Sequence, residues 1–234
     1  MISVCIATYN GEKFIYQQIL SIILQLNIDD EVIISDDGST DDTIKIINSF
    51  NDSRIKIYNG PKKGIVKNFE NAISHANGDF IFIADQDDVW LENKVRDFLI
   101  CFNDNKAVSL IISDCTVVDS NLSIIHDSYF ETRNSGSGLL KNLYKGGFHG
   151  CCMCFRKEML NDILPFPDNI PMHDWWIGLV SEIKGKTFFL NKSLLLYRRH
   201  GLNASSASEN SSNPLSVQIR HRLNLIINLI RRFL

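Results

Sequence analysis

Short apolar runs alternate with segments of helical periodicity through the first half of the chain. The runs are typical of buried strands and predict them at residues 2–7, 31–35, 54–58 and 79–84. Between them, apolar side chains recur with the period of a helix, which predicts helices at 12–24, 42–50, 64–75 and 90–102. Strands that alternate with helices predict a Rossmann-like α/β fold, with a mostly parallel sheet, right-handed crossovers and flanking helices.

The second half of the chain is less regular. Its apolar runs predict strands at 108–118, 150–155, 187–190 and 193–198, and its helical patterns predict helices at 156–160 and 174–183. Residues 119–137 are rich in Asn, Ser and Asp and are expected to form a loop. Residues 204–213 are rich in Ser and Asn and predict a mobile linker, which leads to a basic amphipathic helix over 214–234.

Composition narrows the class of protein. A chain of 234 residues fits one sizeable domain, and a net charge of −3 gives no general attraction to nucleic acid. The six cysteines suggest no disulfide framework, and the run from Cys151 to Cys154 is interpreted as an apolar strand rather than a redox motif. A strand that begins at Ile2 leaves no room for a signal peptide, and no apolar run is long enough to cross a bilayer. A cytoplasmic protein is therefore expected.

Polar clusters follow three of the predicted strands directly. They are Thr8-Tyr9-Asn10, Asp36-Asp37-Gly38 and Asp85-Gln86-Asp87. Ligands of open parallel sheets bind beyond the carboxyl ends of the strands, so these clusters are expected to meet along one edge.

The cluster after residue 84 carries the strongest chemical signal. Asp85, Asp87 and Asp88 repel one another unless a positive charge lies among them, and a hard divalent cation is the usual solution. The alternative is that Asp88 caps the next helix, which accounts for one aspartate and not for three.

The other two clusters suit a nucleotide, because a short polar turn before a helix directs backbone donors towards a ligand. Glu12 opens the first helix, and Asn10 is alternatively its cap. In the second cluster, Ser39 or Thr40 is able to cap the following helix, which leaves Asp36 and Asp37 for hydroxyl or imino groups of a nucleotide.

Taken together, four segments resemble a family 2 glycosyltransferase with the GT-A fold, most closely the rhamnosyltransferase-like enzymes of bacterial surface polysaccharide assembly. The segments are "CIATYNGEKFI", "EVIISDDGSTDDT", "GIVKNFENAISHANGDFIFIADQDDVW" and "MHDWWIGLV". The resemblance covers residues 1–203, with a nucleotide-binding half over about 1–105 and an acceptor-side half over about 106–203. Residues 204–234 then form a linker and helix.

This resemblance implies an inverting transfer of a hexosyl or deoxyhexosyl group from dTDP-rhamnose or a UDP-hexose, with Mg²⁺ or Mn²⁺ as cofactor. The implied acceptor is a lipid-linked glycan of O-antigen or capsule synthesis, used at the cytoplasmic face of the inner membrane. The alternative is a catalytically silent subunit that binds a nucleotide sugar. A Rossmann oxidoreductase is disfavoured because no G-x-G-x-x-G follows the first strand.

The resemblance also implies roles for particular residues. Asp87, with Asp85 and His200, is expected to bind the metal, and Asp174 is expected to be the catalytic base. The nucleotide-sugar site is expected to comprise Thr8, Tyr9, Asn10, Glu12, Asp36, Asp37, Lys67, Asn68, Asp85, Gln86 and Arg199. The acceptor is expected to contact Trp175, His149 and Gly150.

Simpler alternatives remain open for several of these residues. Asp174 is also placed to cap a helix, and adjacent indoles point about 100° apart on a helix, so at most one of Trp175 and Trp176 faces a site. His149 is equally a structural histidine, and Arg198 competes with Arg199 for a phosphate. The 214–234 helix lies on an anionic membrane surface, on its own domain or on a second subunit.

Overall fold

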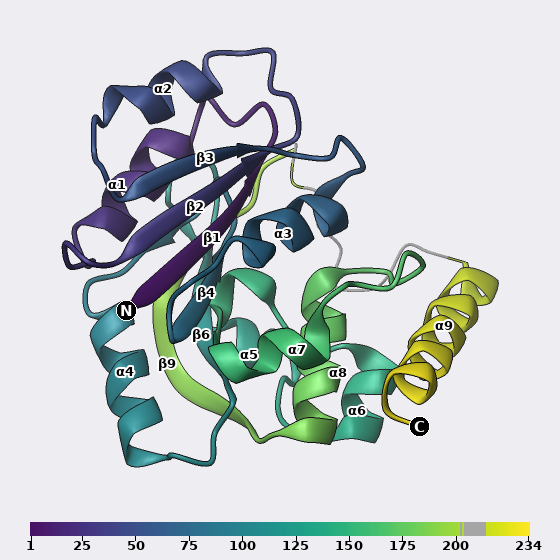
Figure 1. The fold of residues 1–234 in the computed structure, drawn as a ribbon. Coiled ribbons are helices and arrows are strands. Elements are labelled where there is room, and N and C mark those ends of the chain that lie inside the picture. The colour runs from purple at the N-terminus through teal and green to yellow at the C-terminus, as the bar shows by residue number, and fades with distance from the viewer. Residues whose placement is uncertain (202, 204–213) are drawn as a thin grey trace.

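A single mixed sheet forms the centre of the molecule in the computed structural model, which describes residues 1–201, 203 and 214–234 (Figure 1). Within this part, the strand order is β3-β2-β1-β4-β8-β6-β9-β5, and β7 pairs with β6 outside that path. Helices cover both faces of the sheet, and the C-terminal helix lies at the outside of the half that follows β4.

The first half confirms the predicted alternation. Its strands are β1 (Ile2–Thr8), β2 (Glu31–Asp36), β3 (Ile55–Asn59) and β4 (Phe80–Ala84), and its helices are α1 (Ile15–Ile23), α2 (Thr43–Ser49) and α3 (Ile65–Ser74). These four strands pair in parallel, with Thr8 opposite Asp36 and Asp36 opposite Asn59. Strands β1 and β2 are buried along their whole length, as their unbroken apolar runs predict. Parallel register brings their carboxyl ends to one edge.

The segment after β4 differs from the prediction. Residues Val89–Trp90 form the short strand β5, which pairs with the last strand, and helix α4 (Lys94–Asp104) begins only at Lys94. Asn93, in a left-handed conformation, precedes this helix, so the alternative of Asp88 as its cap is wrong. The backbone N–H of Trp90 donates to Ser21 Oγ, and the indole packs against Phe82. Tertiary contacts therefore hold this segment extended.

The second half adds short antiparallel pairings to the mostly parallel sheet. Strand β8 (Met153–Arg156) lies antiparallel between β4 and β6 (Leu110–Val118), whereas β9 (Thr187–Arg198) runs parallel to β6. The two strands predicted over 187–198 are one strand, with an irregular register near residues 190–193. The predicted strand at 150–155 begins instead with a 3₁₀ turn, η1 (Gly150–Cys152).

Several short elements of this half were not predicted. The expected 119–137 loop contains β7 (Ile124–His126) and α5 (Tyr129–Arg133), and α6 (Leu139–Lys145) follows it. The helix predicted at 156–160 is the 3₁₀ turn η2 (Lys157–Met159) followed by α7 (Leu160–Ile163). Helix α8 (His173–Lys184) matches its prediction closely.

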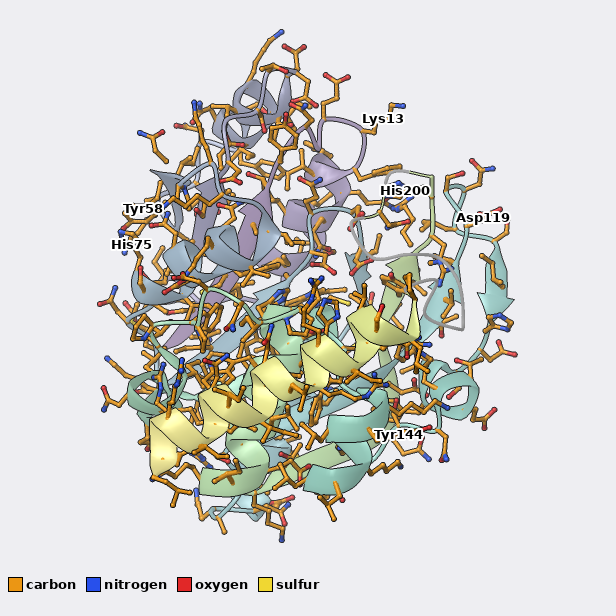
Figure 2. All side chains as sticks on the ribbon, turned by 90° about the vertical axis from the view of Figure 1, so that its right-hand side faces the viewer. Lys13, Tyr58, His75, Asp119, Tyr144 and His200 are labelled. Carbon is orange, nitrogen blue, oxygen red and sulfur yellow. The ribbon has the colours of Figure 1, made fainter. Side chains whose placement is uncertain are left out.

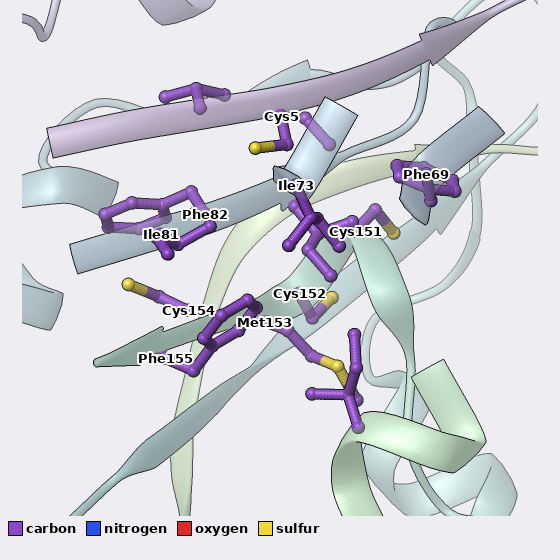
Figure 3. Packing of buried hydrophobic residues seen from close by; sticks show 14 of the residues in the cluster. Cys5, Phe69, Ile73, Ile81, Phe82, Cys151, Cys152, Met153, Cys154 and Phe155 are labelled. Atoms are coloured by element: carbon purple, nitrogen blue, oxygen red, sulfur yellow. The ribbon is translucent and has the colours of Figure 1, made fainter. Parts of the chain in front are cut away.

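The core confirms the apolar interpretation of the cysteine-rich run. All six cysteines are buried and reduced, and Cys154 and Phe155 pack with Ile81 and Phe82 of the neighbouring strand (Figure 3). Helix α9 (Leu215–Phe233) confirms the predicted amphipathic helix, whereas the 204–213 linker lies outside the described residues. None of the helices in the described part combines the length and the apolar character needed to cross a bilayer.

Candidate active site

A cavity of about 690 Å³ opens at the carboxyl ends of β1, β2 and β4. The chain after β4 forms its floor, and the turn before η1, the start of α8 and the end of β9 form the opposite wall. Ten of the residues predicted for the site line it: Thr8, Tyr9, Asp37, Asn68, Asp85, Gln86, Asp87, His149, Gly150 and Asp174. The polar clusters that were predicted to meet at one edge of the sheet therefore meet in a cavity.

The first polar turn is tied to the chain after β4. The backbone N–H of Tyr9 donates to Gln86 Oε1 at 3.0 Å, and Gln86 Nε2 donates back to the carbonyl of Tyr9 at 3.1 Å. Asn68 is buried and donates to the carbonyl of Thr8 at 3.1 Å. These bonds fix the backbone of the first turn at the cavity, where Tyr9 remains exposed.

The second turn is built by its own carboxylates. Asp36 accepts the backbone N–H groups of Gly38 and Ser39 at 3.0 and 2.9 Å and the hydroxyl of Thr8 at 3.0 Å. Asp37 accepts the N–H groups of Lys62 and Gly64 and still borders the cavity. Both carboxylates therefore have structural partners, and only Asp37 reaches the cavity lining.

His200 contacts Asp87 but does not itself line the cavity, and six other predicted residues also lie outside the lining. Asn10 and Glu12 accept N–H groups of the second turn, from Thr40 and Asp42, and so join the two turns. The Nζ of Lys67 is engaged by Phe166 O, Glu70 and Asp168. The remaining three are Asp36, Trp175, whose indole donates to Asn142 O, and Arg199, whose N–H donates to Val118 O.

Buried carboxylates face one another on the floor of the cavity. Burial raises the pKa of Asp85 to about 8, and the neighbouring charges of Asp87 and Asp174 add to the shift. Burial raises the pKa of Asp87 as well, although His200 Nε2 lies 2.8 Å from its Oδ2 and opposes the shift. Asp88 is fully buried, its pKa is also raised by burial, and it accepts the backbone N–H of Arg198 at 2.9 Å.

This donor set fits a hard divalent cation. Carboxylate oxygens that desolvation destabilises are ligands of the kind that Mg²⁺ and Mn²⁺ prefer, and such a cation would offset their repulsion. Ligand atoms of Asp85, Asp88 and Cys151 lie within 4.8 Å of one another. Asn203, which no sequence pattern indicated, donates to Asp87 Oδ2 at 3.1 Å and completes the surroundings of that carboxylate.

Asp174 lies across the cavity in the first turn of α8. Burial raises its pKa to about 6, against the effect of the N–H groups of Trp175 and Gly150, which donate to it. The adjacent indole of Trp176 is fully buried and donates to Ile163 O, so it belongs to the core. A carboxylate with this pKa is suited to proton transfer near neutral pH.

Two further histidines border the same wall. His149 is buried and stacked on Tyr129, and burial lowers its pKa. His173 is buried against Phe69, with ring centroids 4.0 Å apart, and burial lowers its pKa to about 3. Neither ring nitrogen of His173 has a hydrogen-bond partner within the described residues. The sequence predicts a role for Asp174 but none for the neighbouring His173.

Arg198 supports the cavity from behind. Its guanidinium donates to the carbonyls of Asp87 and Ser120 at 2.7 and 2.9 Å and to Gln17 Oε1 at 2.6 Å. Since Arg198 is buried and each of its three guanidinium nitrogens donates to the protein, it supports the backbone at Asp87.

Comparison with known proteins agrees with this arrangement. The sequence model of the Glycosyl transferase family 2 matches residues 3–164, and the chain belongs to that family. The sheet, the flanking helices and the cavity at the strand ends define a GT-A fold.

The similar proteins act on or bind nucleotide sugars. The chain is 28% identical to the dTDP-rhamnosyl transferase RfbG of Shigella flexneri, over 86% of this chain and 74% of that protein. It is 27% identical to the UDP-Glc:alpha-D-GlcNAc-diphosphoundecaprenol beta-1,3-glucosyltransferase WfgD of Escherichia coli, over 93% of this chain and 83% of the relative.

Two solved structures share the fold. S. aureus TarS 1–349 in complex with UDP-GlcNAc matches with a TM-score of 0.75 at 19% identity, over 100% of this chain and 67% of that one. The mannosyltransferase PcManGT from Pyrobaculum calidifontis, in complex with GDP-Man and Mn²⁺, matches with a TM-score of 0.66 at 17% identity, over 98% and 64%. The chain thus spans about two thirds of these structures.

Proposed function

We propose that this chain is a metal-dependent inverting glycosyltransferase that moves a hexosyl or deoxyhexosyl group from a nucleotide sugar to a lipid-linked glycan in bacterial O-antigen or capsule synthesis. One observation carries the proposal: Asp85, Asp87 and Asp174 line the same cavity as the turn at Thr8 and Tyr9. The proposed metal ligands, nucleotide turn and base would therefore share one cavity.

The donor side of the cavity suits a nucleoside diphosphate. The loop around Tyr9 and the carboxylate of Asp37 border the region in which we place the nucleoside. Asp85, Asp87 and His200 would hold Mg²⁺ or Mn²⁺, and such a cation, when bound, stabilises the charge that develops on a departing diphosphate. Arg198 keeps the backbone of Asp87 in place through its bond to that carbonyl.

The opposite wall suits the acceptor and its proton. Inversion requires a base on the face of the sugar opposite the leaving group, and Asp174 is the carboxylate on that wall. Its raised pKa, caused mainly by burial, makes it a stronger base than an exposed aspartate. Gly150, whose N–H donates to Asp174, orients the carboxylate. His149 lines the cavity and remains a predicted acceptor contact, whereas Trp175 lies outside the lining.

The donor sugar and the location are proposed from the relatives. RfbG is named for dTDP-rhamnosyl transfer and WfgD for transfer from UDP-Glc to a diphosphoundecaprenol acceptor, so we propose dTDP-rhamnose or a UDP-hexose. An undecaprenol-type acceptor would place the reaction at the cytoplasmic face of the inner membrane.

The test is a panel of nucleotide sugars, which includes dTDP-rhamnose, UDP-Glc and UDP-Gal, offered with and without Mn²⁺. We expect one donor to raise the melting temperature only with Mn²⁺, and Asp87→Asn to remove that rise. Asp104→Asn, which changes an exposed carboxylate of α4, is the control and should behave as wild type.

The same panel is then assayed for donor hydrolysis and for transfer to a diphosphoundecaprenol glycan. Mn²⁺-dependent binding without turnover on any donor and acceptor pair would contradict the proposed enzyme and support the silent binding subunit instead.

A further inference from the structure

Helix α9 is fixed to the domain by one face. Leu225, Asn228 and Leu229 are buried, and Asn228 Nδ2 donates to Asn169 Oδ1 at 2.7 Å. Arg222 donates to the carbonyl of Tyr144 in α6, and Arg232 donates to carbonyls at residues 162, 164 and 165, next to α7. The opposite face of the helix is exposed, and no part of the described chain covers it.

That opposite face carries a continuous apolar stripe. Its members recur every three or four residues, so they fall along one side of the helix. All are at least 42% exposed: Leu215, Ile219, Leu223, Ile227, Ile230 and Leu234. Neighbouring α6 adds Leu140 and Tyr144, which are 79% and 74% exposed. Figure 2 looks onto this side of the molecule, where α9 crosses the view and Tyr144 is labelled beside it.

The charges around the stripe have one sign. Helices α6 and α9 contain six of the chain's 24 Lys and Arg residues and none of its 27 Asp and Glu residues. Arg220 and Arg231 are exposed on α9, and Lys141 and Lys145 are exposed on α6. The chain as a whole is acidic, with a net charge of −3, so this basic character is local to the two helices.

We propose that this surface, formed by the exposed side chains of α6 and α9 and called here the α6–α9 face, docks on an anionic lipid bilayer. The apolar stripe would enter the boundary between headgroups and acyl chains, and the flanking Lys and Arg side chains would meet lipid phosphates. Docking of a second copy is disfavoured by charge, because an isologous contact would bring two basic surfaces together.

The experiment is vesicle flotation of the whole chain with phosphatidylcholine vesicles that contain or lack phosphatidylglycerol, at low and high salt. We expect flotation only with the anionic vesicles and a loss at high salt, because each basic side chain near the surface contributes about a fivefold gain in partitioning. No donor or acceptor is present, so failure here would leave the proposed glycosyl transfer untouched.

The variant Ile219→Glu/Leu223→Glu should lose at least about tenfold in partitioning, because it removes apolar contact and adds negative charge. Both side chains are about half exposed, at 48% and 52%, so the melting temperature should be unchanged. Leu24→Glu/Ile28→Glu is the matched control, since these side chains are 76% and 78% exposed near the end of α1, away from α9. Arg220→Glu/Arg231→Glu should reduce partitioning without loss of any apolar residue.

Three results would overturn the inference. They are wild-type protein that does not float with anionic vesicles, an Ile219→Glu/Leu223→Glu variant that floats as well as wild type, and a solution dimer that this variant dissociates. The last result, measured by light scattering after size exclusion, would assign the α6–α9 face to a second copy.

Discussion

At the scale of single residues, the site depends on carboxylates whose burial changes their proton affinity. Asp174 has a pKa raised to about 6, mainly by burial, so it is protonated below that pH and unable to accept a proton. We therefore expect kcat/KM to rise with pH through about 6 and to level off above it. A pH profile at saturating Mn²⁺ measures this, with Asp174→Asn alongside.

Asp174→Asn should lower kcat by about 10²–10⁴-fold, the usual contribution of a general base, and should abolish the pH step. Donor affinity, measured by calorimetry with UDP or dTDP and Mn²⁺, should stay within about twofold, since we place Asp174 on the acceptor side of the cavity. Near-normal turnover of this variant would remove Asp174 from the role of base.

His200 gives a second prediction at this scale. Its Nε2 lies 2.8 Å from Asp87 Oδ2, and its ring stacks on Phe14 with centroids 4.6 Å apart. Whether it binds the metal or orients Asp87, His200→Ala should weaken Mn²⁺ binding by about 10–100-fold. Mn²⁺ titration followed by electron paramagnetic resonance measures this, and His126→Ala, on exposed β7, is the control. Unchanged Mn²⁺ affinity would remove His200 from the metal site.

Residues at the ends of predicted strands could be placed from the sequence alone. Thr8 and Asp85 follow apolar runs, and parallel pairing brings such ends together whatever the details of the loops. Lys67 was predicted at the site from the family resemblance, yet Glu70, Asp168 and a carbonyl hold it away from the cavity lining. Asn203 carried no signal, because its bond to Asp87 depends on how the chain turns after β9.

At the scale of elements, β9 and the chain after β4 support each other through Arg198. Its backbone N–H donates to Asp88, and its guanidinium reaches Asp87 O, Ser120 O and Gln17 Oε1. Arg198→Lys cannot reproduce this planar set of donors, so we expect a loss of about 1–3 kcal/mol in the free energy of unfolding. This corresponds to a fall of about 2–12 °C in melting temperature for a chain of this size.

Calorimetric melting of Arg198→Lys measures the change. Arg199→Lys is the matched control, because Arg199 donates to Val118 O through its backbone N–H, which the substitution leaves in place. Equal melting temperatures for wild type and Arg198→Lys would show that the guanidinium bonds contribute little to stability.

The same elements show the limits of prediction from periodicity. Val89 and Trp90 stand at the start of a good helical pattern, and the pattern alone places Trp90 in the helix. In the fold, their pairing with Leu196 and Leu195 of β9 makes them a strand. Short elements such as β7 and α6 have too few residues for a period to be visible, and neighbours in the fold decide them.

At the scale of the whole molecule, we expect the buried aspartates of the cavity to link stability to pH and, through the proposed cation, to metal. The pKa of Asp85 is raised from 3.8 to about 8, and those of Asp87 and Asp88 are also raised, in each case mainly by burial. Between about pH 4 and pH 8, the folded protein therefore binds more protons at these carboxylates than the unfolded chain does. The contribution of these groups to the stability of the metal-free protein should be full at and below about pH 4 and should fall as pH rises towards 8.

A divalent cation competes with those protons for the same oxygens, so its effect should grow as they leave. We expect saturating Mn²⁺ to raise the melting temperature more at pH 8 than at pH 5.5, by the usual linkage between binding and stability. Thermal melting at both pH values, with Mn²⁺ or with EDTA, measures the difference. Asp85→Asn replaces one buried carboxylate by a neutral amide. In this variant, both the dependence of the melting temperature on pH and its rise with Mn²⁺ should become smaller. An Asp85→Asn variant that keeps the wild-type pH slope and the wild-type Mn²⁺ effect would mean that protein partners stabilise the Asp85 carboxylate and that it does not hold a cation.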